Sequence, residues 1–231
     1  TKHMKVEISK RNIITNVEQW HQFAPPKDSD KHWKEGRSAM SLAQFMTNSK
    51  QIKKLEDLLK EWGYDTSGTI KCTPEANTNL PGTGGGRNHD LLMVGKDFVV
   101  GIEAKVTETF GNPISMELFG ATENKSLRIN TLAKDLLGCG VNEKNEHLRY
   151  QLLTGIMGTF YEAKSKSKPK ALFLVIVFTD AITSKDYKVV QNNNKDFEEF
   201  CKYLGLTSDG GEIERDGIKL DIKKIEISLA D

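Results

Sequence analysis

The sequence of 231 residues has few cysteines, no excess of charge of either sign and no long apolar run. Its three cysteines, Cys72, Cys139 and Cys201, are far apart and form no Cys-x-x-Cys pair. This usage argues against a zinc site and indicates a reduced, cytoplasmic setting. No apolar stretch approaches the ~20 residues of a membrane-spanning helix, so we expect a soluble protein without membrane contact. The first residues show no signal-peptide pattern.

Charge is balanced, with 33 Lys and Arg against 32 Asp and Glu and a net charge of +1. Overall charge therefore does not indicate a polyanionic partner, although a local basic patch or a metal ion can still bind one. Hydrophobic residues make up 37% of the chain, which at this length is enough to bury a core. The length fits one large domain.

Hydrophobic periodicity predicts the order of the elements. The first 48 residues show no regular period, and we expect an irregular extension packed on the core. The core, 49–178, is predicted to contain helices at 49–63, 126–138 and 145–163, strands at 68–75, 90–94, 97–106 and 171–178, and a glycine-rich loop at 81–88. Residues 179–231 are predicted to add a helix near 195–204 and a charged hairpin. This order predicts one α/β (α+β) domain with a mixed central sheet flanked by helices.

The predicted strand at 98–106, FVVGIEAKV, raises a question about its two charged residues. Apolar side chains occupy both of its faces, yet Glu103 and Lys105 lie within it. Charged side chains are rarely buried unless they are paired or bind a metal. One explanation is a buried ion pair between the two, which contributes little net stability for its desolvation cost. The other is a metal site.

The preceding strand favours the metal site by supplying a second acid. If a two-residue turn lies at 95–96, Asp90 faces Gly101, and alternation places Glu103 and Lys105 on the same face. Asp90 and Glu103 are then diagonal neighbours, roughly 7–8 Å apart at the backbone. Two carboxylates across such a gap can converge on a hard divalent cation such as Mg²⁺ or Mn²⁺.

The Glu-x-Lys pattern alone is weak evidence for a metal site, because the chain contains other acid-x-lysine triplets. Residues 162–164 repeat Glu-Ala-Lys at a predicted helix end without a paired acid. In the C-terminal hairpin, Glu212 is predicted opposite Asp221, but there an amphipathic hairpin with a solvated charged face explains the pattern.

Asp90, followed on the next strand by Glu103-Ala104-Lys105, resembles the PD-(D/E)XK signature of restriction-endonuclease-like nucleases. Three longer stretches, HWKEGRSA (32–39), IEAKVTETFG (102–111) and LRYQLLTG (148–155), are similar to an uncharacterised bacterial family within that superfamily. The resemblance implies a three-layer α/β/α core over 49–178 and a metal-dependent nuclease. His89 stands where the superfamily motif has Pro.

The resemblance also implies roles for the residues of the motif. Asp90, Glu103 and the main-chain carbonyl of Ala104 would bind Mg²⁺ or Mn²⁺, which polarises a phosphodiester oxygen and lowers the pKa of a water molecule. Lys105 would orient that water or stabilise the transition state. An earlier acid often assists, and Glu75 is the candidate; the alternative is a solvated loop carboxylate.

Further residues are expected to contact the metal site or the nucleic acid. Gln151 matches the Gln-x-x-x-Tyr helix of some exonucleases, although position 155 is Gly. Arg87, in the glycine-rich loop, is a candidate phosphate contact. Trp33 and Arg37 could stack on or grip nucleic acid; the alternative is an N-terminal segment pinned to the core.

We therefore expect a metal-dependent phosphodiesterase that acts on DNA, or alternatively on RNA. Members of the superfamily with one such site often pair, so a homodimer is one expected assembly. A second hypothesis is a non-catalytic module that kept the fold and binds nucleic acid or protein. A third is an enzyme that acts on another phosphate-bearing substrate.

Overall fold

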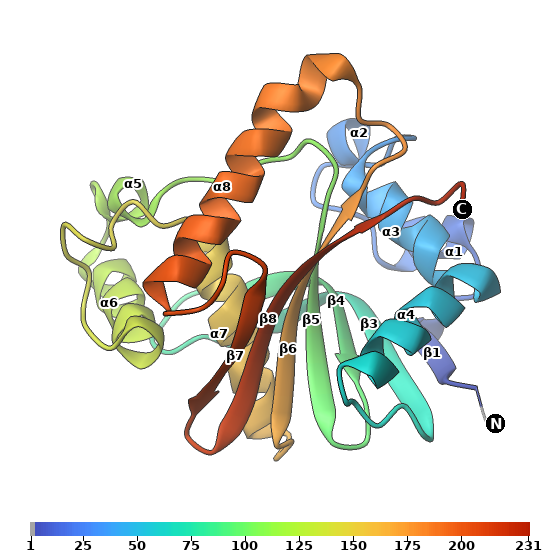
Figure 1. Cartoon of the computed structure of the whole chain (residues 1–231), viewed down its shortest axis with the longest axis horizontal. Coiled ribbons are helices and arrows are strands. Elements are labelled where there is room, and N and C mark those ends of the chain that lie inside the picture. Colours follow the sequence, from blue (N-terminus) through green and yellow to red (C-terminus); the bar gives the residue numbers. More distant parts are fainter. Residues whose placement is uncertain (1–2) are drawn as a thin grey trace.

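A computed structural model describes residues 3–231 as an eight-stranded sheet between two layers of helices (Figure 1). The strand order is β2-β1-β3-β4-β5-β6-β8-β7. The strands are β1 (Lys5–Lys10), β2 (Asn12–Ile13), β3 (Thr69–Thr78), β4 (Arg87–Val94), β5 (Phe98–Lys105), β6 (Lys170–Phe178), β7 (Gly210–Arg215) and β8 (Ile218–Ile227). The helices are α1 (Val17–Phe23), α2 (Ser29–His32), α3 (Ser38–Met46), α4 (Ser49–Glu61), α5 (Ile114–Leu118), α6 (Glu123–Leu137), α7 (Tyr150–Ser165) and α8 (Tyr187–Tyr203).

The sheet is mixed, as predicted. Strands β1, β3, β5, β6 and β8 run in one direction, while β2, β4 and β7 run in the other. The α/β prediction with a three-layer arrangement and a mixed central sheet is confirmed. Because β1, β3, β5, β6 and β8 are parallel, their carboxyl ends lie along one edge of the sheet, which is where ligands usually bind in such folds.

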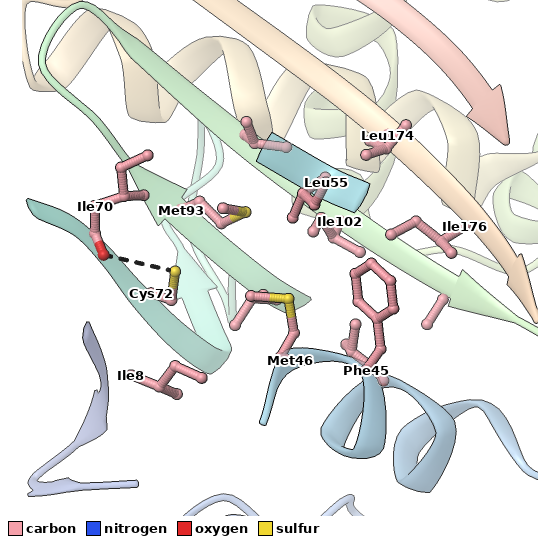
Figure 2. Close-up of a cluster of buried hydrophobic side chains, with 14 of the residues drawn as sticks. Ile8, Phe45, Met46, Leu55, Ile70, Cys72, Met93, Ile102, Leu174 and Ile176 are labelled. Atoms are coloured by element: carbon pink, nitrogen blue, oxygen red, sulfur yellow. Dashed lines mark hydrogen bonds between the residues drawn. The ribbon is translucent and has the colours of Figure 1, made fainter. Parts of the chain in front are cut away.

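Two hydrophobic layers explain why β5 is apolar on both faces. On one face, Phe45, Met46 and Leu55 from α3 and α4 pack on Ile102 and Leu174 (Figure 2). On the other face, α7 packs against β5 and β6. Every residue of β5 is consequently buried, including its two charged ones.

Local signals set several helix ends. Asn48 caps α4 by accepting hydrogen bonds from the main-chain amides of Lys50 and Gln51. Gly138 ends α6 in the left-handed conformation, with φ of 81°. The helix expected from residue 145 begins only at Tyr150, because Asn145 and Leu148 belong to a hydrogen-bonded turn before it.

Both terminal segments contribute strands to the sheet. We expected the N-terminal segment to be irregular, but residues 3–48 contain β1, β2 and three helices. Strand β1 pairs in parallel with β3. The C-terminal hairpin turns as expected, with Glu212 opposite Asp221, but β8 also pairs in parallel with β6. Asp221 is therefore buried and accepts a hydrogen bond from Tyr64 Oη at 3.2 Å, so the expectation of a solvated face is wrong there.

Among residues 3–231, no helix has the length and apolar character needed to span a bilayer.

Candidate metal and phosphate site

The hairpin of β4 and β5 turns one residue later than expected. The Gly95 amide donates to the Phe98 carbonyl at 3.0 Å, so the turn residues are 96 and 97. The pairing is consequently shifted by two residues, and Leu92, rather than Asp90, faces Gly101. A shift of two preserves the face of every side chain within the paired residues 91–94 and 99–102. Continued by one pair, this register brings Asp90 level with Glu103.

Strands β4 and β5 separate at this level, and a side chain enters the gap. Their last ladder pair is Leu91 with Ile102. Beyond it, the Ala104 amide donates to Asp90 Oδ2 at 2.8 Å instead of to a main-chain carbonyl of β4. Because the N–H and C=O of one strand residue point the same way, the Ala104 carbonyl is directed toward the same gap.

Strand β3 is distorted at the matching position. Pro74 pairs with Leu91 and Ala76 pairs with His89, but Glu75, between them, is absent from the ladder. Glu75 has φ of 49°, in the left-handed region that non-glycine residues rarely adopt. The ammonium of Lys10 donates to its carbonyl. Three neighbouring strands thus bring Glu75, Asp90 and Glu103 to one region.

Glu103 is held by two cationic side chains. Its Oε2 accepts from Arg87 Nη2, and its Oε1 lies 3.2 Å from Lys105 Nζ. All three residues are buried, with exposed fractions of 9% or less. Each oxygen of the Glu103 carboxylate therefore faces a cation. The Glu103–Lys105 ion pair considered from the sequence is present, and Arg87 is an additional partner.

Lys105 is fixed between β5, the loop after it and α7. Its Nζ donates to the Thr109 carbonyl at 2.9 Å and to Gln151 Oε1 at 3.1 Å. It also lies 5.3 Å from the centre of the Phe110 ring. The expected proximity of Gln151 to the acidic residues is therefore present, and Gln151 reaches them through Lys105.

The three carboxyl groups differ in their proton affinity. Burial, then the neighbouring Glu103 and Glu75, raises the pKa of Asp90 well above its usual range. Burial also raises the pKa of Glu75 to about 7, against the opposing effect of Lys10. Burial acts in the same direction on Glu103, but Lys105 and Arg87 hold its pKa below the ordinary value. Negative charge is thus disfavoured at Asp90 and Glu75, a condition that a cation would relieve.

The oxygen donors at this site are of the type that binds a hard divalent cation, but among residues 3–231 only two carboxylate side chains, Asp90 and Glu103, are placed to act as ligands. Within the described part of the chain, no three His, Cys, Asp or Glu side chains form a metal-ligand group. Asp90, Glu103 and the Ala104 carbonyl offer oxygen donors of the kind that Mg²⁺ and Mn²⁺ prefer. Mutual repulsion among the acids supports a cation there, whereas the occupied oxygens of Glu103 oppose it.

The three expected substrate contacts occupy different environments. Arg87 lies in β4 and is buried, so it is not the free loop arginine that we expected. Trp33 is half-buried and stacks on His21, with ring centroids 4.7 Å apart. Arg37 is exposed, and the amide of its neighbour Ser38 donates to Glu108 Oε2 at 3.0 Å, which places it near the loop after Lys105.

Sequence reasoning missed one contact of the site. The Arg87–Glu103 pair joins residues 16 apart on adjacent strands, and no local pattern indicates it. His89 is fully buried, and neither of its ring nitrogens has a hydrogen-bond partner in the described part of the chain. The glycine-rich loop is also less free than expected, because Arg128 donates to its carbonyls at Pro81, Gly84 and Gly85.

Comparisons with known proteins add a family assignment to this geometry. Searches of curated proteins and of solved structures found no match. One family model matches residues 13–229, which is nearly the whole chain and includes every residue discussed in this section except Lys10. The chain therefore belongs to the family described as Domain of unknown function (DUF6946).

Proposed function

We propose that the protein is a metal-dependent phosphodiesterase of PD-(D/E)XK type that cleaves nucleic acid, with DNA favoured over RNA. One observation carries the proposal. Asp90, Glu103 and Lys105 converge where β4 and β5 separate, at the carboxyl edge of the parallel strands. A perturbed carboxyl group beside a second acid and an amine is typical of a reaction site.

The chain's own residues have separable roles in this proposal. Asp90, Glu103 and the Ala104 carbonyl would hold Mg²⁺ or Mn²⁺, and Glu75 is a further carboxylate beside them. The bound ion would act as a Lewis acid on a phosphodiester oxygen. Lys105 Nζ would donate to a phosphate oxygen as negative charge develops on it. The Gln151 side chain and the Thr109 carbonyl keep that ammonium in place.

Cleavage of supercoiled plasmid in Mn²⁺ tests the proposal. We expect the double variant Asp90→Asn/Glu103→Gln to lose at least ~100-fold in rate, since both ligand charges are removed. Glu162→Gln is the matched control, because it alters the other Glu-Ala-Lys triplet, at the end of α7, where Lys166 is the one salt-bridge partner of Glu162 among residues 3–231. Circular dichroism spectra and melting curves verify the fold. Undiminished cleavage by the purified double variant would show that the activity does not reside here.

A second candidate is a binding module without catalysis. The observation that favours it is the pairing of both Glu103 oxygens with Arg87 and Lys105, which leaves the carboxylate neutralised without a metal. Such a module would bind DNA duplexes in the absence of divalent cations and give no Asp90-dependent heat on titration with Mn²⁺. The nuclease would give that heat.

A further inference from the structure

Arg87 is held in place by two elements. It is the first residue of β4, and its Nη2 binds Glu103 Oε2. Its Nη1 donates to Thr154 Oγ1 at 2.9 Å and to the Gln151 carbonyl at 3.2 Å, both on α7. The guanidinium therefore bridges the helix and the proposed ligand.

The helix provides the space that the guanidinium occupies. Gly155 faces Arg87, and a Cβ at this position would lie 3.1 Å from Arg87 Nη2 and 2.5 Å from Phe173 Cε1. Any larger residue at position 155 would clash with the Phe173 ring and would also crowd the arginine. Some exonucleases of the superfamily carry tyrosine at this position. Here the residue is Gly155, and the guanidinium of Arg87 lies beside it.

Arg87 and a divalent cation would need the same carboxylate oxygen. Glu103 Oε1 faces Lys105, and Oε2 faces Arg87. A cation that takes Oε2 would lie against the guanidinium, and two like charges at contact distance in a buried site repel each other strongly. Asp90, in contrast, forms no ion pair with a basic side chain within residues 3–231 and accepts from a main-chain amide.

We propose that Arg87 is the resting counter-ion of Glu103 and competes with the divalent cation for Oε2, so that the metal binds only when the guanidinium leaves. This inference rests on the proposed function and adds a regulatory step to it. Release breaks a single charged contact, because Arg87 binds Glu103 through Nη2 alone and its other bonds go to uncharged acceptors, Thr154 Oγ1 and the Gln151 carbonyl on α7. The competition lowers metal affinity and compensates the charge of Glu103 when no metal is bound.

Calorimetric titration with Mn²⁺ tests the competition. We expect Arg87→Met to bind Mn²⁺ at least 10-fold more tightly than the wild type, because it retains an unbranched side chain and removes the competing charge. Arg87→Lys keeps the charge and should bind within about threefold of the wild type. Arg128→Met is the matched control, since Arg128 is equally buried and, among the residues that the structure describes, binds main-chain carbonyls alone; we expect no change. A purely structural arginine would give no gain in affinity.

A second measurement covers the case in which Arg87→Met does not fold. In a wild-type crystal soaked in Mn²⁺, we expect an anomalous peak at Asp90 and a broken Arg87–Glu103 contact. An intact contact beside bound Mn²⁺ overturns the competition.

The two proposals fail in different ways. Asp90-dependent Mn²⁺ binding that is not tightened in folded Arg87→Met removes this inference and leaves the nuclease proposal standing. The absence of Mn²⁺ binding in both the wild type and Arg87→Met removes both.

Discussion

The carboxyl group of Asp90 takes the place of a main-chain acceptor by binding the Ala104 amide at 2.8 Å. This contact closes the gap where β4 leaves β5 and fixes the acid beside Glu103. The same contact opposes the rise in the pKa of Asp90 that burial and the neighbouring acids cause. Its hydrogen-bonding role and its charge can therefore be separated by mutation.

Asp90→Asn should be at least as stable as the wild type at pH 7. The amide oxygen keeps an acceptor for Ala104, and the repulsion from Glu103 and Glu75 is removed. Asp90→Ala leaves the amide without a partner, and we expect it to be less stable than Asp90→Asn by about 1–3 kcal/mol. Urea unfolding at pH 7 measures both. Equal stability of the two variants would mean that the hydrogen bond contributes nothing.

Lys105→Met should separate metal binding from catalysis. Methionine keeps the apolar contact with Phe110 but removes the ammonium that faces Glu103 and Gln151. We expect Mn²⁺ affinity to be unchanged or higher and plasmid cleavage to fall by about 100-fold or more, because the loss is in transition-state stabilisation. Calorimetry and cleavage assays check the two halves. A folded variant that cleaves within a few-fold of the wild type would exclude Lys105 from the reaction.

His89 should make the protein sensitive to acid. Burial, and then Arg87, lowers its pKa to about 3, so the folded protein keeps the ring neutral while the unfolded chain protonates near pH 6.5. The unfolded state thus binds more protons below pH 6.5, and stability falls as pH decreases from 6.5 toward 3, by about 1.4 kcal/mol per pH unit.

The variant His89→Leu isolates this effect. Both ring nitrogens lack hydrogen-bond partners within residues 3–231, so an apolar residue of similar size should be tolerated at pH 7. We expect the difference in unfolding free energy between His89→Leu and the wild type to grow in favour of the variant as pH falls from 6.5 to 5. Urea unfolding at several pH values measures it. A difference that is independent of pH would contradict the buried neutral histidine.

Local sequence patterns were sufficient to predict the central helices and strands, but not the outer strand β1 or the pairing of β8. The period of α4 and the apolar run of β6 predicted those elements closely. Strand β1 was missed, because six residues of alternating polarity have little signal until β3 supplies their hydrogen-bonding partner. The pairing of β8 with β6 was missed for the same reason.

The sequence alone was sufficient to place Asp90, Glu103 and Lys105 in one region. This prediction remained valid although the expected register of β4 against β5 was wrong by two residues. Side chains alternate with a period of two, so within the paired residues 91–94 and 99–102 a shift of two residues moved every pair and changed no face. Glu75, Gln151 and Arg87 were already candidates from the sequence, and the tertiary structure alone decided which groups each of them contacts. Arg87, Glu75 and Gln151 reach the site from β4, β3 and α7, and contacts between segments distant in the chain depend on packing that no local pattern encodes.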